Sequence, residues 1–482
     1  MDTVQDTPSH TYRSKQAWIF FLFLFLFAVS TKRSVSSWND ASRMATIQAL
    51  VEQGTLVIDD TMFVDLTSDI YLYQDDTYSS KPPALAVMGA LVYVPLHLAG
   101  ITFEDDLSLC YFLITLLTIG SISALGLVYF WKMLIEFFGA SIAWANVTTF
   151  LAGAGTLILP YSTVFNSHAV TGSFLLIGSY NAFRFLKYYE IHHVVYSGLL
   201  FSLAASIDTS CFIFLPFAFL LFLRQSFKSA LVFIVSCAPL VLFYFGMNLY
   251  LSDSLLPPTL NALLRSSVDS PFTSDNLSGL ASHDDLSDLS IYAFHMLLGN
   301  RGLLSHTPIL VFSLIGIYYL YRNWAHQRFY TDYMLLLAAC GIYVLLAILR
   351  TNNYSGDAFG VRWFASITLI ICLSLAFIEG TVRSNRKFLL AFWVVSAVSI
   401  LVALLGSYRP FLPTSKLVIS EPQIVDNTIL VALERLVTLS TTMGKTRTLL
   451  LAALLSFIFV LLVRQFHATQ RESRTHQSPT SS

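Results

Sequence analysis

The residue with the clearest chemical potential in this sequence is Asp40, which lies in the stretch SSWNDASRMATIQALVEQG at residues 36–54. Ser37 and Asp40 have the spacing of a capping box, and apolar residues then repeat at helical spacing up to Gly54. The pattern predicts a short amphipathic helix on a membrane surface. Asp40 could act there as a general base, or serve only as a favourable charge in the first helical turn. Arg43, three residues on, could pair with it or bind an anion.

A second candidate is Lys81, in the stretch TYSSKPPALAVM at residues 77–88, directly before an apolar segment. Proline suits the first turn of a helix because its missing N–H would have no partner there. Lysine at such a place could anchor the helix at the lipid headgroups or bind an anionic headgroup. The two alternatives can be separated only by the topology of the whole chain.

Other polar residues lie in the loop after Gly54 and between apolar runs. Asp69 belongs to an acid-rich loop, which is typical of solvated segments and has no ordered metal-ligand spacing. Asp208 stands between two apolar runs, where an acid is costly unless it has a function or reaches the surface. The five cysteines fall inside apolar stretches without metal-ligand spacing and indicate small core residues.

The composition is that of a polytopic membrane protein, with 55% hydrophobic and only 12% charged residues. A net charge of −1 argues against nucleic acid as a partner. The first apolar run lacks a convincing cleavage site and predicts a retained signal anchor. Apolar runs that predict about 12 membrane spans occur at 17–31, 108–131, 143–161, 168–186, 194–208, 210–223, 229–250, 308–321, 331–349, 364–380, 388–406 and 447–464. Several are short, and the pair around Asp208 could form one broken helix.

The distribution of basic residues predicts which loops face the cytoplasm. If the run at 84–101 does not cross, the N-terminus and the basic loops around Arg184, Arg224, Arg322 and Arg386 all lie inside. The outer face then holds the segments 32–107, 251–307, 350–363 and 407–446. Function is therefore expected on the extracytoplasmic side, although Lys445 and Arg447 lie on the outer side of the last span against the rule.

The order of these features resembles the bacterial membrane glycosyltransferases of the GT-C fold, a group that includes protein O-mannosyltransferases and the lipid A aminoarabinose transferase. The resemblance covers roughly residues 15–400. It rests on the acid of the interfacial helix, on GTLVIDD and DIYLYQDDTYSSKPP, on GNRGLLSHTPIL at 299–310 and on NNYSGDAFGVRWF at 352–364. Where many relatives have an Asp-Glu pair, this chain has Asn39-Asp40.

The resemblance implies a GT-C-like all-α bundle and transfer of a sugar from a polyprenyl-phosphate donor to an extracytoplasmic glycan, lipid or protein. It implies Asp40 as the catalytic base, and Lys81, Arg362 and Arg301 as partners of the donor phosphate. The expected substrate-lining residues are Arg43, Asp69, Asn166, His168, Asp208, His306 and Asp357. No specific cofactor is implied, a divalent cation remains open, and membrane lipids are the other expected partners.

The expected organisation is a cytoplasmic N-terminus at 1–16, a catalytic membrane region at 17–406 with its first outer loop at 32–107, an outer segment and last span at 407–464, and a disordered cytoplasmic tail at 465–482. The expected location is the bacterial inner membrane. A transporter or flippase of a lipid-linked or small anionic substrate is the alternative, but no internal repeat is evident. A non-catalytic assembly partner that keeps the fold is a third class, since a fold alone does not give activity.

Overall fold

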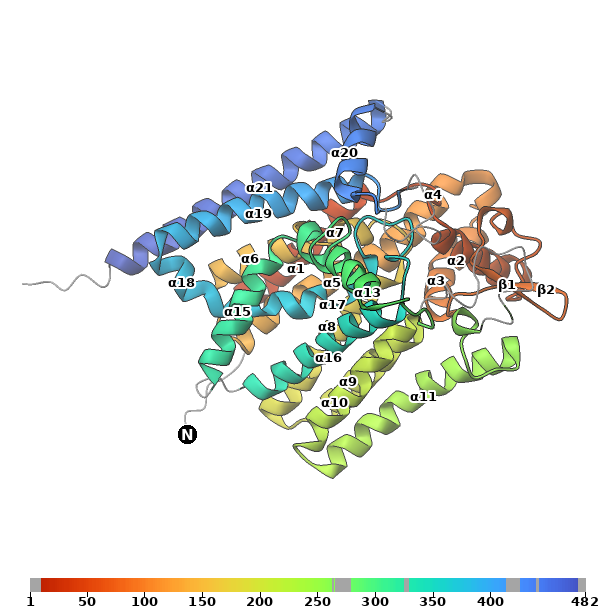
Figure 1. The fold of residues 1–482 in the computed structure, drawn as a ribbon, viewed down its shortest axis with the longest axis horizontal. Helices are drawn as coiled ribbons and strands as arrows, with labels where there is room; N and C mark the ends of the chain where they lie inside the picture. The colour runs from red at the N-terminus through yellow and green to blue at the C-terminus, as the bar shows by residue number, and fades with distance from the viewer. Residues whose placement is uncertain are drawn as a thin grey trace, which may run out of the picture.

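The computed structural model describes residues 10–261, 264, 279–324, 329–412, 425–438 and 442–475. Within them the chain forms a bundle of helices with a loop-rich region at one end (Figure 1). The loop-rich end carries most of the first predicted outer loop, which begins after helix α1. The predicted all-helical polytopic membrane protein is thereby confirmed, with one small exception described below.

Seven helical segments are long and apolar enough to cross a membrane by their length and composition, counted over the described residues. Five of them lie in the single helices α1 (His10–Ser30), α11 (Phe227–Ser252), α16 (Tyr330–Arg350), α19 (Arg386–Tyr408) and α21 (Thr442–Thr475). The other two are interrupted by π or 3-10 turns. They comprise α4 (Phe103–Thr115) with α5 (Ser121–Glu136), and α17 (Ala365–Cys372) with α18 (Glu379–Ser384).

Shorter apolar helices fill the remaining predicted runs. These are α6 (Ile142–Ala154), α7 (Ile158–Tyr161), α9 (His192–Ile207), α10 (Phe214–Leu223) and α15 (Leu310–Arg322). Helix α8 (Ser167–Tyr188) is almost wholly buried and packs against α5, α9 and α17. It is the central helix of the bundle, and each predicted apolar run falls on at least one helix.

The first loop folds as its sequence predicts at both ends of the interfacial helix α2 (Trp38–Gln48). Ser37 and Asp40 form the capping box, and a π turn at Ala49–Gln53 continues the helix to Gly54, whose φ is +70°. The Lys-Pro-Pro segment leads directly into α3 (Ala84–Leu98), which packs against α2 and α4. The Pro-Pro step therefore starts a helix, as predicted.

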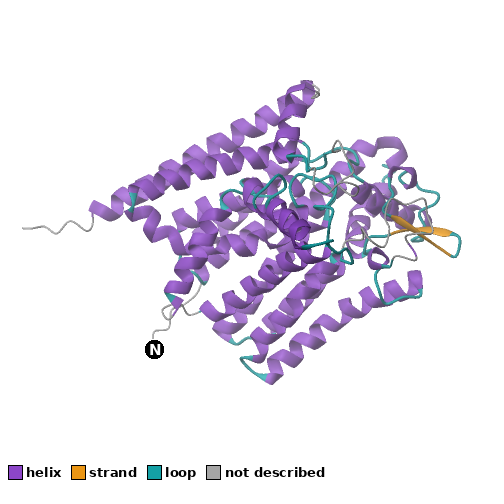
Figure 2. Ribbon diagram, in the orientation of Figure 1, coloured by secondary structure: helices purple, strands orange, loops and turns teal. Residues whose placement is uncertain are grey.

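A two-stranded hairpin in this loop is the exception to the all-α prediction (Figure 2). Strand β1 (Ile70–Tyr73) pairs antiparallel with β2 (Asp76–Ser79), so that Tyr71 faces Tyr78. Gln74 and Asp75 form the turn with φ values of 53° and 70°, as a two-residue hairpin turn requires. No strand was predicted from the sequence in this acid-rich loop.

The loop-rich end is completed by later segments of the chain. Helices α13 (Leu286–Leu297) and α14 (Leu303–His306) precede α15, and α20 (Thr428–Thr438) packs on α19. Helix α20 falls within the segment 407–446 that the sequence predicts on the outer face. Helix α21 extends through Thr475, so the tail predicted to be disordered from 465 is helical over that length. Its end at 476–482 lies outside the described residues.

Candidate active site

A cavity of about 980 Å³ lies at the loop-rich end, between the first loop, the start of α8, the α9–α10 junction and the segment 343–363. Seven residues that the sequence suggested as site residues line it, although they come from distant parts of the chain: Arg43, Asp69, Lys81, His168, Asp208, Asp357 and Arg362. The other four, Asp40, Asn166, Arg301 and His306, are not among the lining residues. The fold therefore separates the predicted residues into two groups.

Lys81 is fixed at the cavity wall by an ion pair with Asp69. Its Nζ lies 2.9 Å from Asp69 Oδ1, and both side chains are largely buried. The carbonyl of Asp69 accepts hydrogen bonds from the N–H and hydroxyl of Ser80 at 2.9 and 3.0 Å. The backbone before α3 is thus tied to the first loop, and this tie holds the ammonium group in place.

Two arginines line the same cavity with incompletely paired guanidinium groups. Arg43 donates from Nη1 to the side-chain and main-chain oxygens of Asn39, but its Nε has no hydrogen-bond partner within the described part of the chain. Burial lowers the pKa of Arg43 to about 10, so the group stays charged at neutral pH. Arg362 Nε likewise lacks a partner there, and its guanidinium carbon lies 5.5 Å from the centre of the Phe411 ring. Buried donors without partners are costly, and two such donors at one cavity wall are suited to an anionic ligand.

His168 and Asp208 form a second polar pair at the cavity wall. His168 Nδ1 lies 2.8 Å from Asp208 Oδ2, and Asp208 Oδ1 also accepts the N–H of Ser210 at 3.1 Å. Because a carboxylate accepts, Nδ1 carries the proton and Nε2 of the neutral ring is free to accept one. Burial opposes ionisation of Asp208, but the His168 contact outweighs it and holds the pKa of that carboxyl below its usual range. This is the arrangement of an imidazole base oriented by an acid.

Asp40 has a different environment from the one expected for a base. Its carboxylate is fully buried and accepts hydrogen bonds from the backbone N–H groups of Ser36 and Ser37 at 2.9 and 2.7 Å. The two serine hydroxyls and the hydroxyl of Tyr111, at 2.9 Å, also donate to it. Burial raises its pKa. The group closes the first turn of α2 and ties it to α4, while its neighbour Asn39 lines the cavity.

Arg301 supports the cavity wall without reaching the cavity. Its side chain is fully buried, and Nη1 donates to the carbonyls of Gly356 and Ala358, both at 2.9 Å. Its Nε donates to the carbonyl of Asp426 at 3.3 Å. These bonds hold the loop that carries Asp357 and Arg362, while Nη2 of Arg301 has no hydrogen-bond partner within the described residues. The expected phosphate contact of Arg301 stays a prediction.

His306 and Asn166 also serve as supports. His306 Nε2 lies 2.7 Å from the hydroxyl of Thr428, and its ring packs edge-on against Phe359. Burial lowers the pKa of His306 to about 3, so the ring is neutral. Asn166 caps α8 by accepting the N–H of His168 at 3.1 Å. The expectation that these two side chains line the substrate site is therefore not met by their positions.

The sequence reasoning missed Arg350 and Asn39, both of which line the cavity. Arg350 ends α16, where a basic residue at the end of a span is usually an interfacial anchor. Asn39 was considered only as the neighbour of Asp40. No local sequence pattern marks either residue as part of a site, because each is brought to the cavity by packing between segments that are distant in sequence.

No family model matches this sequence, and no curated protein matches it. Solved structures do resemble it in fold. Over 96% of this chain and 76% of the other, it is similar to ArnT from Cupriavidus metallidurans bound to undecaprenyl phosphate, with a TM-score of 0.54 at 14% identity. The same protein in its apo state gives 0.53 at 14% identity over 95% and 76% of the two chains.

A third similar structure is the Archaeoglobus fulgidus oligosaccharyltransferase tethered to an acceptor peptide containing the NVT sequon. It has a TM-score of 0.50 at 13% identity, over 84% of this chain and 56% of that one. At these identities the likeness concerns the fold, which agrees with the expected span pattern and the interfacial helices of the first loop. The chain therefore has the GT-C fold of membrane glycosyltransferases.

Proposed function

We propose that this protein is an integral-membrane glycosyltransferase that moves a sugar from a polyprenyl-phosphate donor to an acceptor on the extracytoplasmic face. The observation that carries the proposal is the cavity, which combines incompletely paired cations with an acid-oriented histidine on a GT-C fold. ArnT, the structural neighbour, has been solved with undecaprenyl phosphate bound. A lipid-linked phosphate is the kind of ligand that this set of cations would hold.

In the proposed reaction, the acceptor oxygen attacks the anomeric carbon of the donor sugar. The bond from that carbon to the donor phosphate oxygen breaks, and its electron pair stays on the phosphate. Lys81, Arg43 and Arg362 would stabilise the charge that develops there, because fixed cations in a partly dry site act most strongly on growing charge. The proton of the acceptor passes to the base.

For the base we propose Nε2 of His168, with Asp208 holding the ring in the required tautomer. Asp40, which the family resemblance suggests, is the competing candidate. Five hydrogen bonds to its carboxylate and its absence from the cavity lining support a capping role instead. The two assignments make opposite predictions for single variants.

The test supplies the purified protein in lipid with a panel of labelled polyprenyl-phosphate sugars and measures donor binding and sugar transfer or release. His168→Gln and Asp208→Asn should lower turnover by about 10² to 10⁴-fold with donor affinity little changed. Asp40→Asn should lower the thermal midpoint by leaving buried donors to the carboxylate unpaired, at a cost of about 1 to 3 kcal/mol, while the folded fraction keeps its turnover. Asp60→Asn, an exposed loop variant outside the cavity, is the control.

If Asp40→Asn instead abolishes turnover in fully folded protein and His168→Gln does not, the base assignment is wrong and Asp40 takes the role. If no donor of the panel is turned over but a lipid-linked anion is moved across vesicles, the transporter alternative replaces the transferase. The cavity of about 980 Å³ is large enough for a sugar and part of a second substrate.

A further inference from the structure

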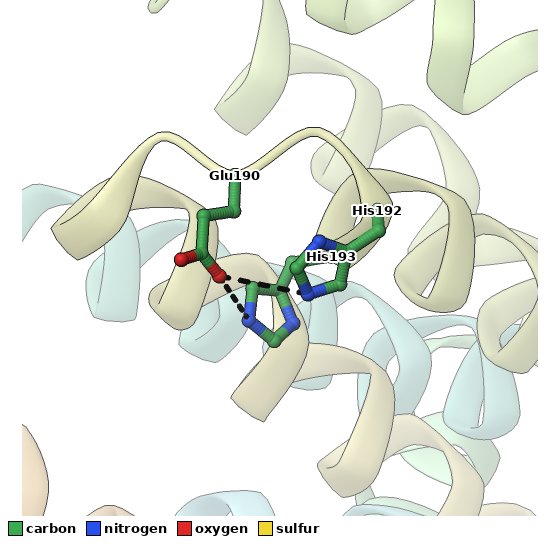
Figure 3. A group of neighbouring side chains, drawn as sticks. All are labelled: Glu190, His192 and His193. Carbon is green, nitrogen blue, oxygen red and sulfur yellow. Dashed lines mark ion pairs between the residues drawn. The ribbon is translucent and has the colours of Figure 1, made fainter.

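A second group of ligating side chains lies far from this cavity, at the turn that joins α8 to α9. Glu190, His192 and His193 each present one ligand atom there, and the three atoms lie within 4.8 Å of one another (Figure 3). Glu190 Oε2 is 3.5 Å from Nε2 of His192 and 3.5 Å from Nε2 of His193. The transfer reaction proposed above makes no use of these residues.

The spacing of these atoms fits a tetrahedral metal ion. Zinc binds histidine nitrogen and carboxylate oxygen at about 2.0–2.2 Å, so two ligands of a tetrahedral site lie about 3.3–3.5 Å apart. Both carboxylate-to-imidazole distances in the turn equal the upper end of this range. Two imidazoles and a carboxylate are also the ligand types that zinc accepts, with water completing the fourth position.

A buried asparagine fixes His193 in the form that a metal requires. Asn181 Nδ2 donates to the carbonyl of Ile177 at 2.9 Å, so its Oδ1 is the atom facing His193 Nδ1 at 2.8 Å. A carbonyl oxygen only accepts, and Nδ1 therefore carries the ring proton. The lone pair of Nε2 then points toward the carboxylate of Glu190, which also offers only lone pairs. A second partner that orients a histidine in this way is typical of metal ligands.

We propose that Glu190, His192 and His193 bind a divalent transition-metal ion of the zinc type, which clamps the α8–α9 turn. Helix α8 begins at Ser167 and α9 ends at Ile207, so the same two helices carry His168 and Asp208 at their opposite ends. The bound ion would fix the turn at one end of the α8–α9 helix pair, and His168 and Asp208 lie at the other end of that pair. Glu190 and His192 are half exposed, with 51% and 53% of their side chains accessible, and a second cavity of about 630 Å³ reaches His193. The ion can therefore enter from solvent.

One neighbouring cation competes with the ion. Arg184 Nε lies 3.5 Å from His193 Nε2, and its Nη1 lies 3.7 Å from Glu136 Oε2. Metal binding would displace the first of these long contacts and leave the second. Replacing Arg184 by a neutral residue should therefore tighten metal binding. If the three side chains served only the structure of the turn, this substitution would not raise the affinity for a metal ion.

The experiment titrates the full-length protein, freed of any histidine tag, with Co²⁺ and follows the visible absorption of tetrahedral cobalt, with Zn²⁺ as the competitor. Wild type should bind one equivalent. His192→Ala, His193→Ala and Glu190→Gln should each weaken binding by at least about tenfold. Arg184→Gln should strengthen it, and Zn²⁺ should raise the thermal midpoint of wild type but not of the three ligand variants.

Ile191→Ala is the matched control, because it lies in the same turn and removes no ligand atom. The proposal is overturned if wild type and His192→Ala bind cobalt equally, or if binding is not tetrahedral. The proposal is also overturned if His192→Ala alone weakens cobalt binding, because the ion would then be bound by an isolated surface histidine. None of these outcomes depends on whether the protein transfers a sugar.

Discussion

At His306 a histidine is held neutral inside the loop-rich end. Its pKa of about 3 lies far below that of a histidine in an unfolded chain, because burial disfavours the charged ring. Between these two values the unfolded state binds more protons than the folded state, so stability rises with pH in that range. The contribution of neutral His306 to the free energy of unfolding is complete above about pH 6.5 and is lost as the pH falls towards 3.

This difference predicts that acid weakens the protein through His306. The thermal midpoint of wild type should fall between pH 7 and pH 4, with a slope of up to about 1.4 kcal/mol per pH unit from this residue. His306→Gln keeps an amide that can bond the hydroxyl of Thr428, and it should show a flatter profile. Equal slopes in the two proteins, measured by differential scanning fluorimetry, would contradict the assignment.

The guanidinium of Arg362 allows a second prediction at this scale. A planar fork can hold two oxygens of one phosphate, whereas an ammonium group acts as a point charge. Arg362→Lys should therefore weaken binding of a polyprenyl phosphate by roughly tenfold. Arg322→Lys, at the exposed end of α15, should leave it unchanged. Equal dissociation constants for wild type and Arg362→Lys would remove this residue from the phosphate site.

The sequence indicated which charged residues lie near the cavity better than it indicated the role of each. Lys81 and Asp208 were singled out by local features, a Pro-Pro step and an acid between apolar runs, and both line the cavity. Asp40 had an equally clear local pattern, and Arg301 was implied by the family resemblance, but their side chains bond to Tyr111 and to the carbonyl of Gly356 respectively. Those partners lie far away in the chain, and their positions depend on the assembled fold.

At the scale of elements, the loop at 355–361 depends on the close approach of Gly360 to His306. Gly360 has a φ of +65°, and a Cβ at this position would lie 2.9 Å from Cγ of His306. Both the conformation and the space favour glycine. The loop then continues into Arg362, so its shape determines where that side chain lies.

Gly360→Ala should accordingly lower the thermal midpoint and weaken donor binding together, with a loss of more than about 1 kcal/mol in stability. Gly246→Ala is the matched control, because it lies within α11 with nothing within 4 Å of the added Cβ, and it should be neutral or slightly stabilising. Unchanged stability and donor affinity in Gly360→Ala would show that the loop adapts.

Local patterns predicted the helical elements well and the irregular ones poorly. Ser37, Asp40 and Gly54 marked both ends of the interfacial helix, and apolar length marked the spans. The hairpin at 70–79 was missed because its strands are only four residues each and lie in an acid-rich loop. The extension of α21 through Thr475 was missed because a polar composition resembles that of a disordered tail.

At the scale of the whole molecule, the cavity and the α8–α9 turn lie at opposite ends of the bundle. Helix α8 runs from His168 at the cavity to Tyr188 beside the turn. The count of basic residues in the loops predicts that the cavity end faces the extracytoplasmic side, and this orientation remains part of the proposed function. The proposed transfer reaction and the proposed metal site would then face different compartments.

This orientation can be tested with single cysteines, since all five native cysteines are buried. Asp75→Cys, in the exposed hairpin turn, should react in intact cells with a thiol reagent that cannot cross membranes. Gln225→Cys, in the exposed α10–α11 turn, should react only after the membrane is opened. The reverse pattern would place the cavity on the cytoplasmic side and the α8–α9 turn on the outer side, which would contradict the orientation that the basic loops predict.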